Sequence, residues 1–280
     1  MRWQMGRRSD NVEDRRGTGF GKKAAGGGLG TIVLVLVAMY FGVDPAIVTQ
    51  LTGLTGGGSV QQAQRTPSAE ENKEADFVSA VLADTEDTWG AIFQEKGGRY
   101  QQPKLVLFSG MVQSACGTAN AAVGPFYCPG DRKVYIDLDF YNDLKEKLGA
   151  PGDFAQAYVV AHEIGHHVQN LLGISDKVQA LRPKLPAVEY NKYQVRLELQ
   201  ADCLAGIWAN HANRARNIIE PGDIDEALNA ASMIGDDRLQ KRARGYVTPD
   251  SFTHGTSAQR VQWFTRGYEH GDFESCNTFQ

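Results

Sequence analysis

Two histidines and a glutamate capable of metal chemistry lie close together in the run His162-Glu163-Ile164-Gly165-His166. On a helix, residues four apart project from the same face, so both imidazoles can bind one tetrahedral zinc ion. Glu163, next to the first ligand, can take a proton from the metal-bound water and pass it to the leaving amine. The spacing therefore predicts a zinc peptidase with His162 and His166 as ligands and Glu163 as general base.

The sequence around this motif favours a helix. The preceding run FAQAYVVA consists of strong helix formers with an apolar face. Gly165 inside such a helix costs roughly 1 kcal/mol relative to alanine, which indicates that another backbone approaches closely. The alternative interpretation is an ordinary helix with two solvent-facing histidines. His167 turns away from the face of His162 and His166 and is interpreted as a neighbour, and His211 as a surface histidine.

A catalytic zinc site needs a third protein ligand and an open position. Glu198 and Asp202 are four residues apart in a segment with helical periodicity, and so lie on one helix face. We predict that Glu198 binds the metal and that Asp202 accepts the free N–H of His162. The alternative is that both are solvated carboxylates of an amphipathic helix.

His254 and Arg260 form a further candidate pair, since a histidine in a loop precedes a helix that carries the arginine. We predict that His254 donates a hydrogen bond or positive charge to the oxyanion of the transition state, and that Arg260 positions His254 or a neighbouring carboxylate. A helix cap with a surface histidine and a structural arginine explains the same residues equally well.

The elements that must position these residues follow from hydrophobic periodicity. Amphipathic helices are expected at 76–94, 154–172, 190–213, 223–234 and 257–270, the last capped by Thr256. Short strand-like runs are expected at 104–108, 125–128 and 133–137. The expected fold class is α+β, a helix-rich domain with a small sheet.

The four cysteines lack CxxC spacing, which argues against a thiolate zinc site or a thioredoxin-like redox pair. We expect disulfides, the alternative being buried free thiols of a cytosolic protein. Cys116 and Cys128 can close the loop between the first two predicted strands. Cys203 and Cys276 would then tie the long middle helix to the C-terminal tail, although spacing alone does not fix connectivity.

The charge is divided along the chain. Residues 1–23 carry seven basic and three acidic residues, so the remainder accounts for −8 of a chain whose net charge is −4. An acidic domain without a basic stripe is a poor partner for phosphate backbones, and nucleic-acid binding is set aside.

Residues 29–43, LGTIVLVLVAMYFGV, are uncharged, and small residues before them extend the stretch toward the length of a membrane span. We expect a transmembrane helix at 26–45, a basic cytoplasmic N-terminus at 1–25, a flexible linker at 46–73 and an exported domain at 74–280. The alternatives are a buried core helix or a cleaved signal peptide.

With these residues in place, the chain resembles a bacterial family named putative neutral zinc metallopeptidases, and the resemblance covers nearly the whole chain. The segments that carry it are MRWQMGRRSDNVEDRR, CGTANAAVGPFYCPGDRKVYIDLDFY, AYVVAHEIGHHVQNLLG, LELQADCLAG and FTHGTSAQRVQWF. Glu198–Asp202 and Thr253–Arg260 are also similar to segments of gluzincin peptidases, which commonly have proline where this chain has Gly255. The resemblance implies a zincin-like domain, Glu198 as third zinc ligand and His254 as a transition-state donor.

The sequence thus predicts a membrane-anchored zinc metalloendopeptidase of the bacterial inner (cytoplasmic) membrane, with the catalytic domain on the periplasmic or extracytoplasmic side. Its expected cofactor is Zn2+ and its expected partner a protein or peptide substrate. One alternative is a membrane-tethered binding or chaperone-like module with a structural zinc or a latent site. Another is a zinc hydrolase acting on a non-peptide amide such as a cell-wall crosslink.

Overall fold

The computed structural model describes residues 1–17, 66–120 and 124–280. Met1–Arg16 and Pro67–Gln280 belong to one folded unit. The transmembrane helix predicted at 26–45 lies outside the described residues. In the ranges that are described, no helix is long and apolar enough to cross a membrane.

A four-stranded sheet lies in the order β1 (Val12–Asp14), β2 (Lys104–Phe108), β6 (Lys133–Asp137), β5 (Phe126–Cys128). β1 and β6 pair with β2 in parallel, whereas β5 pairs with β6 antiparallel. The three predicted strands are therefore confirmed as β2, β5 and β6. Strand β1 was not predicted, and β5 forms one edge of the sheet.

The two faces of the sheet pack into two separate hydrophobic clusters. Alternate side chains of one strand point to opposite faces, so neighbouring residues belong to different clusters. Leu105, Leu107 and Ile136 belong to the main core, while Val106 and Tyr135 belong to a smaller cluster on the other side. A hairpin of β3 (Met111–Ser114) and β4 (Gly117–Asn120) contributes Val112 to that smaller cluster. The Cys116–Cys128 disulfide, as predicted, ties this hairpin to β5.

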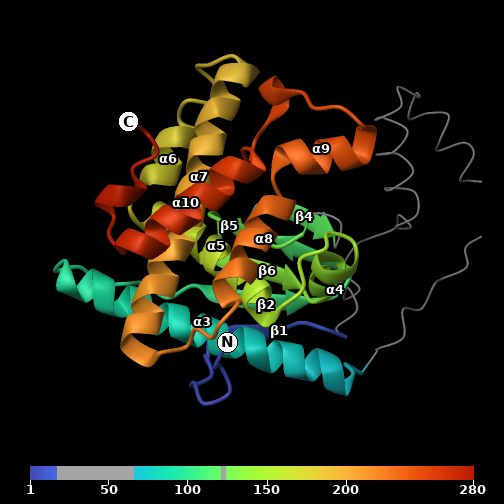
Figure 1. The fold of residues 1–280 in the computed structure, drawn as a ribbon, viewed down its shortest axis with the longest axis vertical. Helices are drawn as coiled ribbons and strands as arrows, with labels where there is room; N and C mark the ends of the chain where they lie inside the picture. The colour runs from blue at the N-terminus through green and yellow to red at the C-terminus, as the bar shows by residue number, and fades with distance from the viewer. Residues whose placement is uncertain (18–65, 121–123) are drawn as a thin grey trace, which may run out of the picture. The chain divides into compact units, whose positions relative to one another are not determined.

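Helices make up most of the described chain (Figure 1). In order they are α3 (Ala69–Glu95), α4 (Asp139–Glu146), α5 (Asp153–Leu171), α6 (Ile174–Gln179), α7 (Ala187–Arg216), α8 (Asp223–Met233), α9 (Asp236–Arg244) and α10 (Ser257–His270), with short 3-10 turns at Pro249–Ser251 and η3 (Glu274–Cys276). The five predicted helices are confirmed as α3, α5, α7, α8 and α10. Helices α4, α6 and α9 were not predicted.

Capping boxes fix two of the helix starts. Ser68 accepts a hydrogen bond from the Glu71 amide while the Glu71 carboxylate accepts one from the Ser68 amide, so α3 begins at Ala69 rather than at 76. Thr256 and Gln259 form the equivalent box at α10, as predicted for Thr256. These local bonds set where the helices carrying core and site residues begin.

Helices α5 and α10 lie against α7 (Figure 1), and glycines at the contacts allow the close approach. A Cβ on Gly165 of α5 would lie 2.9 Å from the Ala201 carbonyl oxygen of α7, so the predicted close backbone approach is confirmed. Gly206 of α7 and Gly267 of α10 face each other's helix backbones in the same way. The predicted Cys203–Cys276 disulfide is also present, and it ties α7 to η3.

The N-terminal segment is part of this domain and not separate from it. Arg7, Ser9 and Asn11 all donate hydrogen bonds to the carboxylate of Glu86, which is 2% exposed on α3. The described part of the predicted N-terminal segment at 1–25 thus belongs to the same folded unit as the domain predicted at 74–280, and that unit resumes at Pro67.

Candidate metal centre

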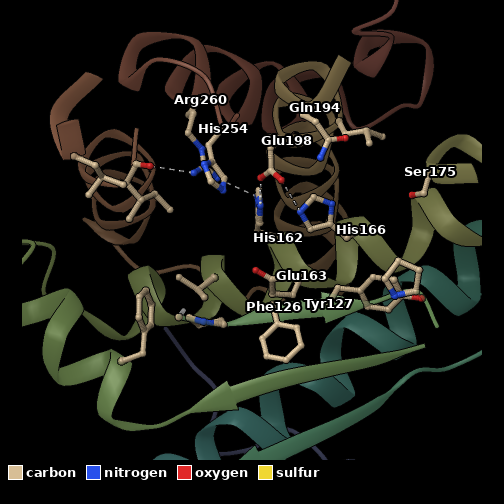
Figure 2. Close-up of a pocket in the computed structure, with 18 of the residues that line it drawn as sticks. Phe126, Tyr127, His162, Glu163, His166, Ser175, Gln194, Glu198, His254 and Arg260 are labelled. Carbon is tan, nitrogen blue, oxygen red and sulfur yellow. Dashed lines mark hydrogen bonds and ion pairs between the residues drawn. The ribbon is translucent and has the colours of Figure 1, made fainter. Parts of the chain in front are cut away.

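Helices α5 and α7 bring the three predicted ligands together (Figure 2). His162 Nε2 lies 3.1 Å from Glu198 Oε2, and His166 Nε2 lies 3.5 Å from Glu198 Oε1. Ligand atoms of all three residues fall within 4.8 Å of one another. The i, i+4 spacing on α5 and the close crossing of α7 at Gly165 produce this convergence.

The arrangement fits zinc. Ligands about 2.0–2.1 Å from a tetrahedral zinc ion are about 3.3–3.4 Å apart, and the two observed separations lie on either side of that value. Two imidazoles and one carboxylate are a donor set that zinc takes in catalytic sites, and the three residues that supply them could hold a metal ion.

Asp202, fully buried on α7, fixes the tautomer of His162. His162 Nδ1 donates to Asp202 Oδ1 at 2.8 Å, which leaves the lone pair of Nε2 directed at the metal position. Arg260 donates to both carboxylate oxygens at 2.9 Å, so it positions a neighbouring carboxylate, one of its two predicted roles. Tyr158 donates to the same carboxylate. Burial alone would raise the pKa of Asp202, but Arg260 and His162 outweigh it and lower the pKa to about 2.

The carboxylates around the imidazoles favour a positive charge at the centre. Burial alone would lower the pKa of His162, but Asp202 and Glu198 outweigh burial and raise it to about 9. The pKa of His166 is also raised, because Glu198 outweighs burial there. Without metal, protons supply the positive charge at neutral pH, and a bound cation would replace them.

His254 lines the same cleft and is held by Asp236, the first residue of α9. Its Nδ1 lies 3.2 Å from Asp236 Oδ1, and this hydrogen bond, against the effect of burial, raises the pKa of His254. Asp236 Oδ2 accepts the backbone amides of Thr253, His254 and Gly255. The loop is therefore fixed by one carboxylate that the sequence analysis did not identify.

The backbone conformation at position 255 explains why this loop has glycine where gluzincins commonly have proline. The φ of Gly255 is +90°, a conformation that favours glycine and that proline's fixed φ of about −65° excludes. Its amide also donates to Asp236, and proline has no N–H to donate. Glycine is the residue that this particular loop requires.

Glu163 faces a cleft of about 960 Å³ that is also lined by His162, His166, Glu198 and His254. Figure 2 shows the Glu163 carboxylate directed into this cleft beside His162. Within the described part of the chain, no side chain forms a hydrogen bond with that carboxylate. A water molecule or a substrate amine can therefore reach it.

Two of the remaining three histidines, His167 and His211, were assigned roles from the sequence, and both lie outside the ligand group. His167 donates to the Gln101 carbonyl and accepts from Tyr127, and burial lowers its pKa to about 4, so it is a neutral neighbour as predicted. His211, predicted at the surface, is instead partly buried and bonded to the Gly271 carbonyl.

Three supporting residues, Tyr158, Gln169 and Asp236, were missed from the sequence. Tyr158 is four residues before His162 and therefore on the same helix face, a signal that was available. Gln169, whose Oε1 lies 3.0 Å from His166 Nδ1, had the analogous signal, because it is three residues after His166 on one helix. Asp236 had none, because its partner loop is distant in sequence.

The chain forms a helix-rich α+β domain in which a His-Glu-x-x-His helix and a glutamate of a second helix make up a candidate zinc site. A family model described as "Putative neutral zinc metallopeptidase" matches residues 1–279, and the chain belongs to that family. This confirms the resemblance found in the sequence.

Two relatives show the extent of the likeness. Uncharacterized protein YpfJ of Escherichia coli (strain K12) is 54% identical over 290 residues, which cover 100% of this chain and 99% of that protein. Uncharacterized protein Rv2575 of Mycobacterium tuberculosis is 41% identical over 256 residues, covering 86% of this chain and 85% of that protein. No solved structure matches the chain.

Proposed function

We propose that this protein is a zinc-dependent endopeptidase. The observation that carries the proposal is the convergence of His162, His166 and Glu198 on one point of a cleft that also holds the carboxylate of Glu163. Membership of the zinc metallopeptidase family supports the same reaction.

The side chains divide the work of peptide hydrolysis. Zinc, when bound, would polarise the substrate carbonyl and lower the pKa of a coordinated water molecule to about 7. Glu163 accepts the proton of the attacking water and delivers it to the leaving nitrogen. His254, oriented through Nδ1 by Asp236, donates a hydrogen bond from Nε2 to the carbonyl oxygen as negative charge develops.

The substrate class follows from the walls of the cleft. Phe126 and Tyr127 of edge strand β5 line it, and the far edge of β5 has no partner strand in the ranges that the structure describes. An extended polypeptide can pair with such an edge and place its carbonyl groups near the ligands. This favours a protein or peptide substrate.

Location is part of the proposal. Two disulfides favour an oxidising compartment, and so a domain outside the bacterial cytoplasm. Since Met1–Arg16 folds with the domain, we place both on that same side. A membrane-impermeant thiol reagent applied to intact cells that carry Arg2→Cys would label the N-terminus; protection until lysis would argue against this location.

The test of function compares the purified full chain with Glu163→Gln. Both forms should hold one zinc per chain by mass spectrometry, whereas cleavage of an unfolded protein should fall by about 10²–10⁴-fold in the variant. Glu95→Gln, an exposed change of the same kind on α3, should leave cleavage unchanged. A binding module would keep its function in Glu163→Gln, and cleavage of peptidoglycan fragments alone would favour the cell-wall alternative.

A further inference from the structure

A chain of buried amides connects the second metal ligand to the C-terminal tail. His166 Nδ1 lies 3.0 Å from Gln169 Oε1, and Gln169 is fully buried on α5. Gln169 Nε2 donates to the Leu197 carbonyl at 2.7 Å and to Gln200 Oε1 at 3.1 Å. Gln200 Nε2 in turn donates to the Cys276 carbonyl at 3.0 Å.

The direction of every bond in this chain is fixed by its two backbone carbonyls. A carbonyl only accepts hydrogen bonds, so the amide nitrogen of Gln200 must face Cys276 and its oxygen must face Gln169. The Leu197 carbonyl orients Gln169 in the same sense. The oxygen of Gln169 therefore faces His166, which must carry its proton on Nδ1 and keep the lone pair of Nε2 for a metal.

The tail that supplies one of these carbonyls is itself anchored. The Cys203–Cys276 disulfide holds it to α7 on one side of the carbonyl. On the other side, the hydroxyl of Thr278 donates to the Arg196 carbonyl of α7 at 2.7 Å. Cys276 and Thr278 are both buried, so the carbonyl is a fixed point for Gln200.

We propose that Gln169 is the positioning residue for His166, and that Gln200 extends its support to the disulfide-anchored C-terminal tail. The inference rests on the zinc site of the proposed function. It gives His166 an orienting partner of a different kind from the Asp202 carboxylate that orients His162. It also gives the tail, which is remote from the cleft in sequence, a role in metal affinity.

The experiment measures zinc affinity by competition with a chelator, together with the visible spectrum of the cobalt-substituted full chain. Gln169→Leu should weaken zinc binding by about 10–100-fold and alter the cobalt spectrum, because His166 loses its orienting acceptor. Gln200→Leu should act in the same direction but less, since the Leu197 carbonyl still orients Gln169. Asn170→Leu, an adjacent amide that donates to Tyr127 and not to a ligand, is the matched control and should change neither quantity.

A folded Gln169→Leu with native zinc affinity and cobalt spectrum would overturn the inference, since a merely structural glutamine would lower stability alone. If that variant fails to fold, Gln200→Leu decides: unchanged zinc affinity overturns the connection to the tail. These readouts do not use peptide cleavage. A native chain that binds zinc but cleaves nothing would defeat the proposed function alone, whereas a native chain that binds no zinc would defeat both.

Discussion

Replacing Arg260 by leucine tests the most deeply buried charge pair of the site. The Arg260 and Asp202 side chains are 3% and 0% exposed, and the guanidinium donates two hydrogen bonds to the carboxylate. In Arg260→Leu, Asp202 keeps Tyr158 and His162 as partners but loses its permanent cation. A buried carboxylate is then left with less compensation for its desolvation.

The expected cost follows from that burial. Removing one partner of a buried ion pair typically destabilises a protein by about 3–5 kcal/mol. For a domain of this size, each kcal/mol lowers the melting temperature by roughly 2–4 °C, so a fall of about 6–20 °C is expected. Urea unfolding of the metal-free protein, followed by circular dichroism, gives the free energy directly.

Arg8→Leu is the matched control. Arg8 makes the same forked contact with Asp76, but these side chains are 33% and 48% exposed, so its loss should cost about 1 kcal/mol or less. The reasoning is refuted if the two substitutions lower the free energy of unfolding by the same amount. In that case the buried pair contributes no more than a solvated one.

Three further outcomes are expected. Zinc binding at pH 7 should release at least one proton, because the pKa of His162 is about 9 without metal and a ligand must be neutral; calorimetry in two buffers of different ionisation enthalpy measures this. Asp236→Ala should lower kcat and move its alkaline limb to lower pH, because the bond that raises the pKa of His254 is lost; an unchanged pH profile would contradict this role. Deleting Met1–Arg16 should destabilise the chain by about 3–5 kcal/mol in urea unfolding, because buried Glu86 loses its three partners; an unchanged midpoint would show that the segment is dispensable.

The ligands on α5 could be predicted because the relevant geometry is local. Helical periodicity fixes which residues share a face, so His162 and His166 follow from their spacing alone. Glu198 is different, since it lies on another helix and its choice depended on the number of ligands that zinc requires and on the family resemblance. Gly165 is the point where α5 and α7 approach closely. In the sequence the only sign of this contact was a glycine, an unfavourable residue, inside a predicted helix.

The residues that could not be predicted are held by contacts distant in sequence. Helix α9, DDRLQKRAR, has Leu239 as its one large apolar residue and gives no periodic signal, yet its first residue, Asp236, fixes the His254 loop. The basic N-terminus was interpreted as the flank of a membrane span. In the folded chain Arg7 and Arg8 pair with carboxylates of α3, an arrangement that charge counting along the sequence does not reveal.

The residues that would bind the metal and the groups that orient them come from different parts of the chain. All three predicted metal ligands come from α5 and α7, whereas the groups that begin their supporting hydrogen bonds come from later elements. Arg260 of α10 holds Asp202, which orients His162. The carbonyl of Cys276 in the tail orients Gln200, which together with Gln169 connects the tail to His166. The first support requires α10 to lie directly on α7, which the facing glycines of the two helices permit. The second requires the disulfide that anchors the tail to α7. Zinc affinity should therefore respond to changes in the C-terminal elements as well as to changes near the motif itself, because an imidazole that is present but misdirected is a poor ligand.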